Sequence, residues 1–162
     1  VGGTIAWLTA TTDPVVNTFT YGKIKIELTE TKPENKQATI IPGVNISKDP
    51  KVTVKADSEA CWLFVKVAEE GTFVAKKVTY SVADGWAELP GVAGVYYREV
   101  NAVTADTDFY VLKDNMVTVS EELTKAEVNS VATQPTLTFT AYAVQKDGID
   151  TAAEAWAKVK NN

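Results

Sequence analysis

The segment Ala60–Val67 reads Ala-Cys-Trp-Leu-Phe-Val-Lys-Val, and it is apolar on both faces for most of its length. A strand exposed on one face alternates apolar and polar residues, whereas a strand covered on both faces is apolar nearly throughout. Residues 57–58 and 69–71, which are polar or glycine, bound the segment as turns would. The segment therefore predicts a central strand with cover on both faces, and one of its buried faces is expected to hold Cys61, Leu63, Val65 and Val67.

Strand patterns continue on both sides of this segment. Lys23–Glu30 alternates polar and apolar residues without a break, which is the period of a half-buried strand. The composition agrees, because 22 Val, 21 Thr and 7 Ile among 162 residues have the stiff branched side chains that favour pleated sheet. Further strands are predicted at 39–41, 52–54, 78–82, 86–89, 95–100, 109–112, 116–119 and 135–144.

Two short helices are expected beside these strands. Residues 123–131 have helical spacing, with Thr124 or Ser120 as the N-cap, and residues 151–159 form a second helix anchored by Trp156 and capped by Asp150 or Thr151. About eight to ten strands at spacings of roughly 8–12 residues predict a mainly β fold, a jelly-roll-like antiparallel β-sandwich. We expect residues 1–12 to form an N-terminal apolar strand and tether, and residues 13–162 to form a single β-sandwich domain.

The absence of certain residues narrows the possible functions. The chain has no histidine, which removes His-ligated zinc, Ser-His-Asp and Cys-His catalysis. A single cysteine allows no intrachain disulfide and no Cys-rich metal site. The net charge of −5 disfavours nucleic acid and anionic membrane surfaces as partners. We therefore predict a protein that is not an enzyme, with no catalytic residues, metal site or cofactor, and with no nucleic-acid partner and no membrane association in the mature form.

The remaining candidate residues have ordinary structural interpretations. Cys61 lies on the most apolar strand and is expected to act as a small buried hydrophobe, since no histidine is present to activate it. Asp106 and Asp108 could ligate calcium, but no EF-hand-like loop surrounds them, so solvated turn charges are the favoured interpretation. Several aromatic residues could instead line a sugar-binding face, and at least one of Tyr96 and Tyr97 is expected to face solvent: Trp62, Trp86, Tyr96, Tyr97 and Tyr110.

The N-terminal segment Val1–Leu8 is the most informative feature for function. It contains no charged side chain, and a polar stretch, Thr9–Asp13, separates it from the rest of the chain. As a strand, it places Val1, Gly3, Ile5 and Trp7 on one face and Leu8 on the other. Such a strand can be the first strand of its own domain, or it can leave the domain and complete the sheet of a neighbour. The second possibility makes a linear assembly, with these residues as the subunit interface.

Two segments resemble a known family. Gly2–Thr9 reads Gly-Gly-Thr-Ile-Ala-Trp-Leu-Thr, and Asn17–Ile26 reads Asn-Thr-Phe-Thr-Tyr-Gly-Lys-Ile-Lys-Ile. This pair is similar to the start of the TasA/camelysin-like proteins of Gram-positive bacteria, which are secreted with a signal peptide of the SipW type. Weaker likenesses follow at Ile41–Gly43, Lys51–Lys55 and Leu63–Val67, and at the closing residues 138–145 and 152–156.

The resemblance implies a jelly-roll subunit of extracellular fibres, such as those of a biofilm matrix, whose subunits are joined by N-terminal donor strands. Camelysins have also been described as metalloproteases, but a chain without histidine does not support that activity. We therefore predict a secreted structural protein, extracellular or on the cell surface, that forms a homopolymeric filament (a pilus or matrix fibre). Its expected partners are copies of itself, with other matrix or surface proteins as possible additional partners. The donor strand is expected to use Val1, Gly3, Ile5, Trp7 and Leu8. The alternative is a monomeric β-sandwich adhesin of the cell surface that binds glycan or protein ligands.

Overall fold

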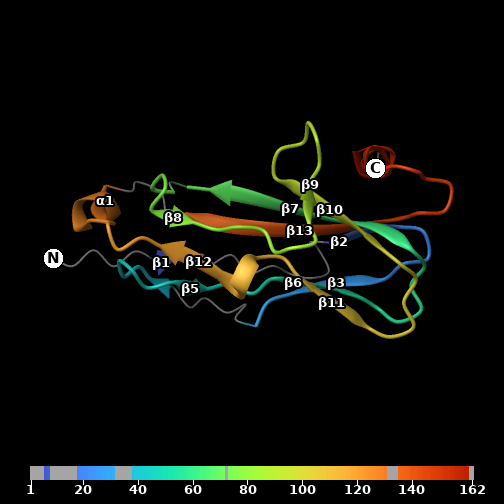
Figure 1. The fold of residues 1–162 in the computed structure, drawn as a ribbon, viewed down its shortest axis with the longest axis horizontal. Coiled ribbons are helices and arrows are strands. Elements are labelled where there is room, and N and C mark those ends of the chain that lie inside the picture. Colours follow the sequence, from blue (N-terminus) through green and yellow to red (C-terminus); the bar gives the residue numbers. More distant parts are fainter. Residues whose placement is uncertain (1–5, 8–17, 32–37, 72, 131–134, 161–162) are drawn as a thin grey trace.

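The computed structural model describes residues 6–7, 18–31, 38–71, 73–130 and 135–160. Figure 1 shows two layers of strands seen edge-on, with one helix lying outside the upper layer and another at one end of the molecule. The mainly β sandwich predicted from the sequence is confirmed.

The upper layer is a five-stranded sheet. Its strands, in spatial order, are β2 (Thr18–Tyr21), β13 (Thr136–Gln145), β7 (Cys61–Glu70), β10 (Val95–Val100) and β9 (Ala87–Glu88). The long strands β7 and β13 pair antiparallel over all ten residues of each. The edge strand β2 pairs parallel to β13, so the sheet is not wholly antiparallel.

The lower layer contains two three-stranded groups. The first has the order β11 (Thr107–Tyr110), β6 (Lys51–Val54) and β3 (Ile26–Thr29), and the second has the order β5 (Ile46–Ser47), β12 (Met116–Val119) and β8 (Val78–Thr79). The two groups join because β5 leads into β6, while β11 leads into β12 through the 3-10 turn η1 (Lys113–Asn115). Backbone hydrogen bonds from Val111 N–H to Pro50 O (3.0 Å) and from Lys48 N–H to Asn115 O (2.8 Å) continue the pairing across this junction.

The two faces of β7 enter two different hydrophobic clusters. Cys61, Leu63, Val65 and Val67 all point into the main core between the layers, as predicted. Trp62 and Phe64 point the other way, into a second cluster roofed by Trp156 of the C-terminal helix. This double cover explains why the segment is apolar on both faces, and it confirms β7 as a central strand.

Both predicted helices are present. The helix α1 (Lys125–Asn129) begins after Thr124, whose hydroxyl accepts a hydrogen bond from Glu127 N–H, and the Glu127 carboxylate accepts one from Thr124 N–H in return. The helix α2 (Ala152–Lys160) follows Thr151, whose hydroxyl accepts a hydrogen bond from Glu154 N–H. The Trp156 side chain is buried and fixes α2 to the outer face of the upper layer.

Two strands were absent from the sequence-based prediction. β2 is half-exposed, and β5 has two residues, so neither provides a period long enough to recognise. A further difference concerns Tyr96 and Tyr97. The expectation that one of them faces solvent is wrong, because Tyr96 packs against the main core and Tyr97 packs against the second cluster. Both tyrosine side chains are therefore partly buried, one on each face of β10.

Candidate assembly interface

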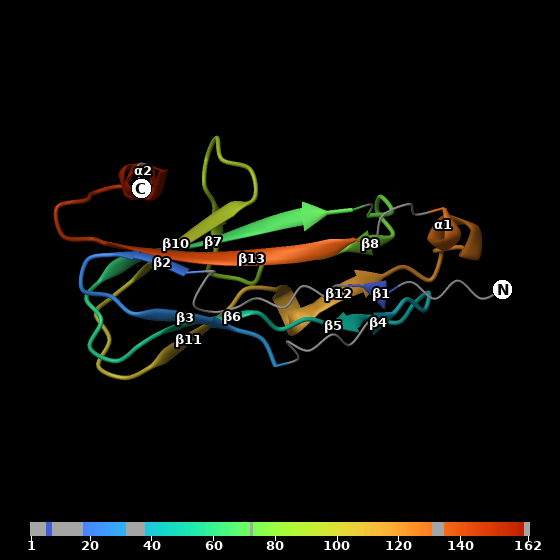
Figure 2. The same ribbon diagram turned by 180° about the vertical axis from the view of Figure 1, so that it is seen from behind.

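The N-terminal strand pairs within its own chain. β1 (Ala6–Trp7) forms an antiparallel two-stranded sheet with β4 (Ala38–Thr39), with Ala6 opposite Thr39 and Trp7 opposite Ala38. Within the described residues, β1 pairs with no other strand. Figure 2 shows this small sheet toward the end of the molecule that carries α1, whereas β2 lies toward the end that carries α2.

The structure thus places Trp7 in a strand, as the sequence predicted. The other four residues expected in the donor strand, Val1, Gly3, Ile5 and Leu8, lie outside the described residues. Donation of this strand to a neighbour stays a prediction. Within the described residues, the pairing of β1 with β4 spans two residue pairs.

The second part of the candidate interface is one edge of β13. On one side β13 pairs with β7 along its whole length, but on the other side β2 covers Ala141–Val144 alone. Among the described strands, none pairs with Thr136–Thr140 on that side. Figures 1 and 2 place this half of β13 in the same half of the molecule as β1 and β4.

The residues of this stretch of β13 are typical of a strand that accepts another. Thr136–Thr140 reads Thr-Leu-Thr-Phe-Thr, with Leu137 and Phe139 fully buried and no charge or proline. Natural edge strands that avoid pairing usually carry charges, prolines or bulges. The edge strand β11 of the lower layer follows that rule, since it is flanked and interrupted by Asp106 and Asp108. The β13 stretch has neither a charge nor a proline within Thr136–Thr140, and Pro135 directly precedes it.

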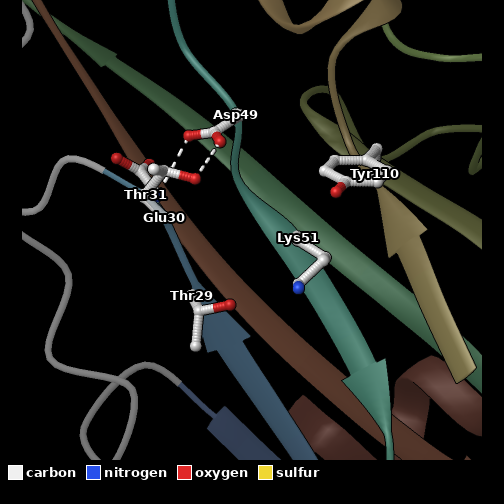
Figure 3. A pocket seen from close by; sticks show the side chains of 6 residues that line it. All are labelled: Thr29, Glu30, Thr31, Asp49, Lys51 and Tyr110. Carbon is white, nitrogen blue, oxygen red and sulfur yellow. Dashed lines mark hydrogen bonds between the residues drawn. The ribbon is translucent and has the colours of Figure 1, made fainter. Parts of the chain in front are cut away.

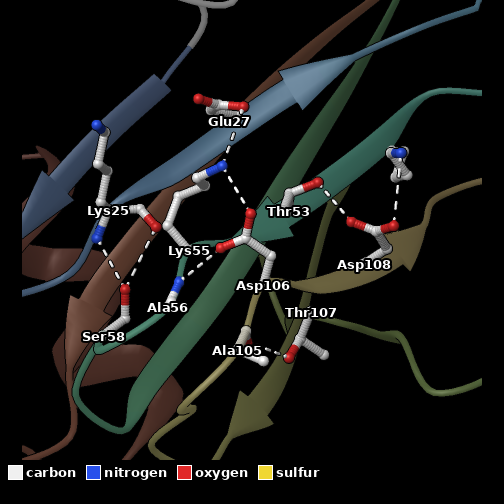
Figure 4. Close-up of polar contacts among 11 residues, drawn as sticks. Lys25, Glu27, Thr53, Lys55, Ala56, Ser58, Ala105, Asp106, Thr107 and Asp108 are labelled. Atoms are coloured by element: carbon white, nitrogen blue, oxygen red, sulfur yellow. Dashed lines mark hydrogen bonds and ion pairs between the residues drawn. The ribbon is translucent and has the colours of Figure 1, made fainter.

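The carboxylates that might have bound calcium are engaged by groups of the protein itself. Figure 4 shows Asp106 accepting hydrogen bonds from Lys55 Nζ and from Ala56 N–H, both at 2.8 Å, and Asp108 accepting one from the Thr53 hydroxyl at 2.6 Å. The hydrogen bond from Lys55 is the main cause that lowers the pKa of Asp106. For Asp108 the pKa is lowered chiefly by the Thr53 hydrogen bond. These contacts favour the interpretation of Asp106 and Asp108 as surface charges that stabilise the pairing of β6 with β11.

A shallow pocket opens on the same outer face of the lower layer. Its cavity volume is about 120 Å³, and Figure 3 shows its lining residues, with Asp49 hydrogen-bonded to Thr31. Small-molecule sites usually enclose about 300–1,000 Å³. The lining residues are Thr29, Glu30, Thr31, Asp49, Lys51 and Tyr110.

The aromatic residues suggested for ligand binding are mostly covered. Trp62 is buried and donates its indole N–H to Ile149 O at 3.0 Å. Trp86 is half-buried beneath the Arg98 guanidinium, which lies 5.1 Å from its ring centre. Of the five aromatic candidates, Tyr110 alone is classed as exposed, with 45% of its surface accessible. One exposed ring beside a small polar pocket is a weak basis for an adhesin.

Cys61 lies in the main core with no exposed surface, and burial raises the pKa of its thiol to about 12. The reactive thiolate is therefore scarce at neutral pH. We expect the native protein to resist iodoacetamide at mildly alkaline pH and to become fully labelled after denaturation in urea, as measured by mass spectrometry. Labelling of the native protein as fast as of the denatured protein would contradict this assignment.

The structure also reveals a buried ion pair that the sequence analysis missed. Lys48 Nζ lies 3.0 Å from Glu30 Oε2, and the two side chains are 5% and 4% exposed. The Lys48 ammonium lies 5.6 Å from the ring centre of Phe139, which belongs to the opposite layer. Alternation could have identified Glu30, because it continues the inward-facing series of Ile24, Ile26 and Leu28.

Comparisons of the chain with protein-family models, with curated proteins and with solved structures found no match. The resemblance to the TasA/camelysin-like proteins therefore rests on the sequence patterns given above and stays a prediction. Within the described part of the chain, no helix is long and apolar enough to cross a membrane.

Proposed function

We propose that this protein is the structural subunit of an extracellular filament, a homopolymer in which the N-terminal strand of one subunit pairs with a neighbour. The observation that supports the proposal is the stretch Thr136–Thr140 of β13, which has no partner strand on its β2 side among the described residues. Backbone N–H and C=O groups along a strand edge are obligatory hydrogen-bonding groups, so such an edge is a template for an added strand.

The N-terminal strand supplies a suitable donor. Val1–Leu8 has no charged side chain, and its two described residues, Ala6 and Trp7, pair with Thr39 and Ala38 of the same chain. A donated strand from each subunit repeats the same contact at every step, which gives a head-to-tail filament rather than a closed dimer. Secretion and a place in a surface fibre or biofilm matrix follow from the resemblance to the TasA/camelysin-like proteins.

Negative-stain microscopy of the purified full chain at increasing concentration tests this proposal. We expect long fibres of uniform width, and light scattering that increases with protein concentration. Monodisperse particles at all concentrations would contradict the proposal and would favour a monomeric adhesin.

A pair of matched substitutions tests whether the β13 edge is the acceptor. Thr138→Lys places a charge on the proposed acceptor stretch of β13, whereas Thr118→Lys places the same charge on β12, which has strands on both sides. Because charged side chains protect sheet edges from pairing, Thr138→Lys should suppress fibres while Thr118→Lys should not. Circular dichroism of both variants checks that each still folds.

A further inference from the structure

The buried pair of Glu30 and Lys48 has a third member, Asn115. The pairing of β5 with β12 sets Met116 opposite Ser47 and Val117 opposite Ile46, and the next position sets Asn115 opposite Lys48. The hydrogen bond from Lys48 N–H to Asn115 O, at 2.8 Å, extends the ladder to this pair. Residues directly opposite one another on neighbouring strands place their Cβ atoms about 5 Å apart, within reach of a long side chain.

Two buried acceptors in this cluster have no hydrogen-bond partner among the described residues. They are Glu30 Oε1 and Asn115 Oδ1. A buried acceptor without a partner costs about 1–3 kcal/mol, so each needs an explanation. The Lys48 ammonium can donate three hydrogen bonds. Among the described residues it donates one, to Glu30 Oε2. Lys48 Nζ also lies 5.6 Å from the ring centre of Phe139, and Asp49 is a further charged group near Glu30.

The backbone at Asn115 is unusual as well. Asp114 and Asn115 both have positive φ, 56° and 53°, in the turn η1. Non-glycine residues in this region cost energy and persist where the surrounding structure holds them. Here the turn is held between Leu112 O, which accepts from Asn115 N–H, and Lys48 N–H, which donates to Asn115 O.

We propose that Lys48 and Asn115 join through a self-formed isopeptide bond between Nζ and Cγ, with Glu30 as the proton acceptor. The chemistry needs a buried amine, a carboxamide within its reach and a carboxyl group at hydrogen-bond distance. Lys48 Nζ lies 3.0 Å from Glu30 Oε2, and Asn115, whose Oδ1 is buried, is joined to Lys48 through a backbone hydrogen bond. Burial raises the pKa of Glu30 and outweighs the lowering by Lys48, which suits a group that must take up a proton.

The reaction balances without any other reactant. Glu30 takes a proton from the Lys48 ammonium, and the neutral amine attacks Cγ of Asn115, forming the new C–N bond. The attacking nitrogen passes a second proton to Nδ2 as the Cγ–Nδ2 bond breaks. Ammonia leaves, and it carries off the proton held by Glu30 as ammonium. The products are one amide bond and one ammonium ion, and Glu30 ends ionised as it began.

Such a bond would tie the segment between β5 and β6 to the turn before β12 at the middle of the lower layer. It would close a covalent loop that contains β6 and β11, so a pulling force along the chain would pass through the bond and leave residues 49–114 unloaded. Resistance to pulling would suit a subunit of a fibre. The proposal is argued from Glu30, Lys48 and Asn115, however, and does not depend on filament formation.

Intact-mass spectrometry of the purified full chain under denaturing conditions tests the proposal. We expect a mass lower by one ammonia than the sequence requires, with no tryptic cleavage after Lys48. We also expect a linked peptide that contains Lys48 and Asn115. The full sequence mass, both in fresh protein and after long incubation, would overturn the proposal. So would an ammonia loss that persists in Lys48→Arg.

Two matched variants test the role of Glu30. Glu30→Gln keeps the shape of the side chain but cannot accept the proton, so we expect it to fold and to retain the full mass. Glu27→Gln changes the same strand on its outer face, where the Glu27 side chain is 45% exposed, and should still lose ammonia. Complete cross-linking in Glu30→Gln would refute the proposed role of Glu30. The wild-type measurement decides the existence of the bond even if a variant fails to fold.

Discussion

Deletion of residues 1–8 is expected to leave a folded monomer that forms no fibres. An eight-residue strand spans about 26 Å, enough to run along one sheet edge. Burying the side chains of Val1, Ile5, Trp7 and Leu8 in a neighbour would contribute on the order of 10 kcal/mol before the cost of ordering the segment. Removal of the donor therefore removes most of the contact between subunits. Microscopy and size-exclusion chromatography measure the outcome.

A synthetic peptide of residues 1–8 extends this experiment. Added to the truncated protein, it should bind and raise the melting temperature, because it completes the sheet that lacks a strand. A control peptide with Ile5 and Trp7 replaced by serine keeps the length but loses the anchors, and it should not bind. Truncated protein that still forms fibres would contradict strand donation outright.

A different outcome would point to an intrachain role. The structure pairs β1 with β4 of the same chain, so the strand can also serve its own domain. In that case the deletion would unfold the protein or lower its melting temperature sharply, and the full chain would stay monomeric at high concentration. That result would contradict the filament proposal as well.

Leu63→Ala should lower the free energy of unfolding by about 2–5 kcal/mol, since it leaves a cavity in the main core. Leu63 has no exposed surface and lies on β7, with β10 on one side and β13 on the other. Those two neighbouring strands limit how far the backbone can relax into the space. Urea denaturation followed by tryptophan fluorescence measures the change.

The matched control for this substitution is Lys66→Ala. Lys66 lies on the same strand but is exposed, so its truncation should change the free energy of unfolding by less than about 0.5 kcal/mol. A loss below about 1 kcal/mol for Leu63→Ala would show that β7 is not the central strand of the core.

The pattern of side chains along the sequence was enough to predict the strands that are buried on one or both faces and the two helices. The double apolar character of Ala60–Val67 predicted β7, and the alternation of Lys23–Glu30 predicted the inward face of β3. Capping residues predicted both helices, with Thr124 and Thr151 in place. In each case the signal lies within a few neighbouring residues, because burial repeats with the period of the element.

Tertiary structure alone decided which strands meet. The period of a strand tells which side chains are buried, but it does not say which strand lies beside it, since backbone hydrogen bonds do not depend on residue type. The parallel pairing of β2 with β13 and the approach of Glu30 to Lys48 both join segments that are distant in sequence. For the same reason the sequence predicted an exposed tyrosine on β10, whereas Tyr96 is partly buried against the main core and Tyr97 is partly buried against the second cluster.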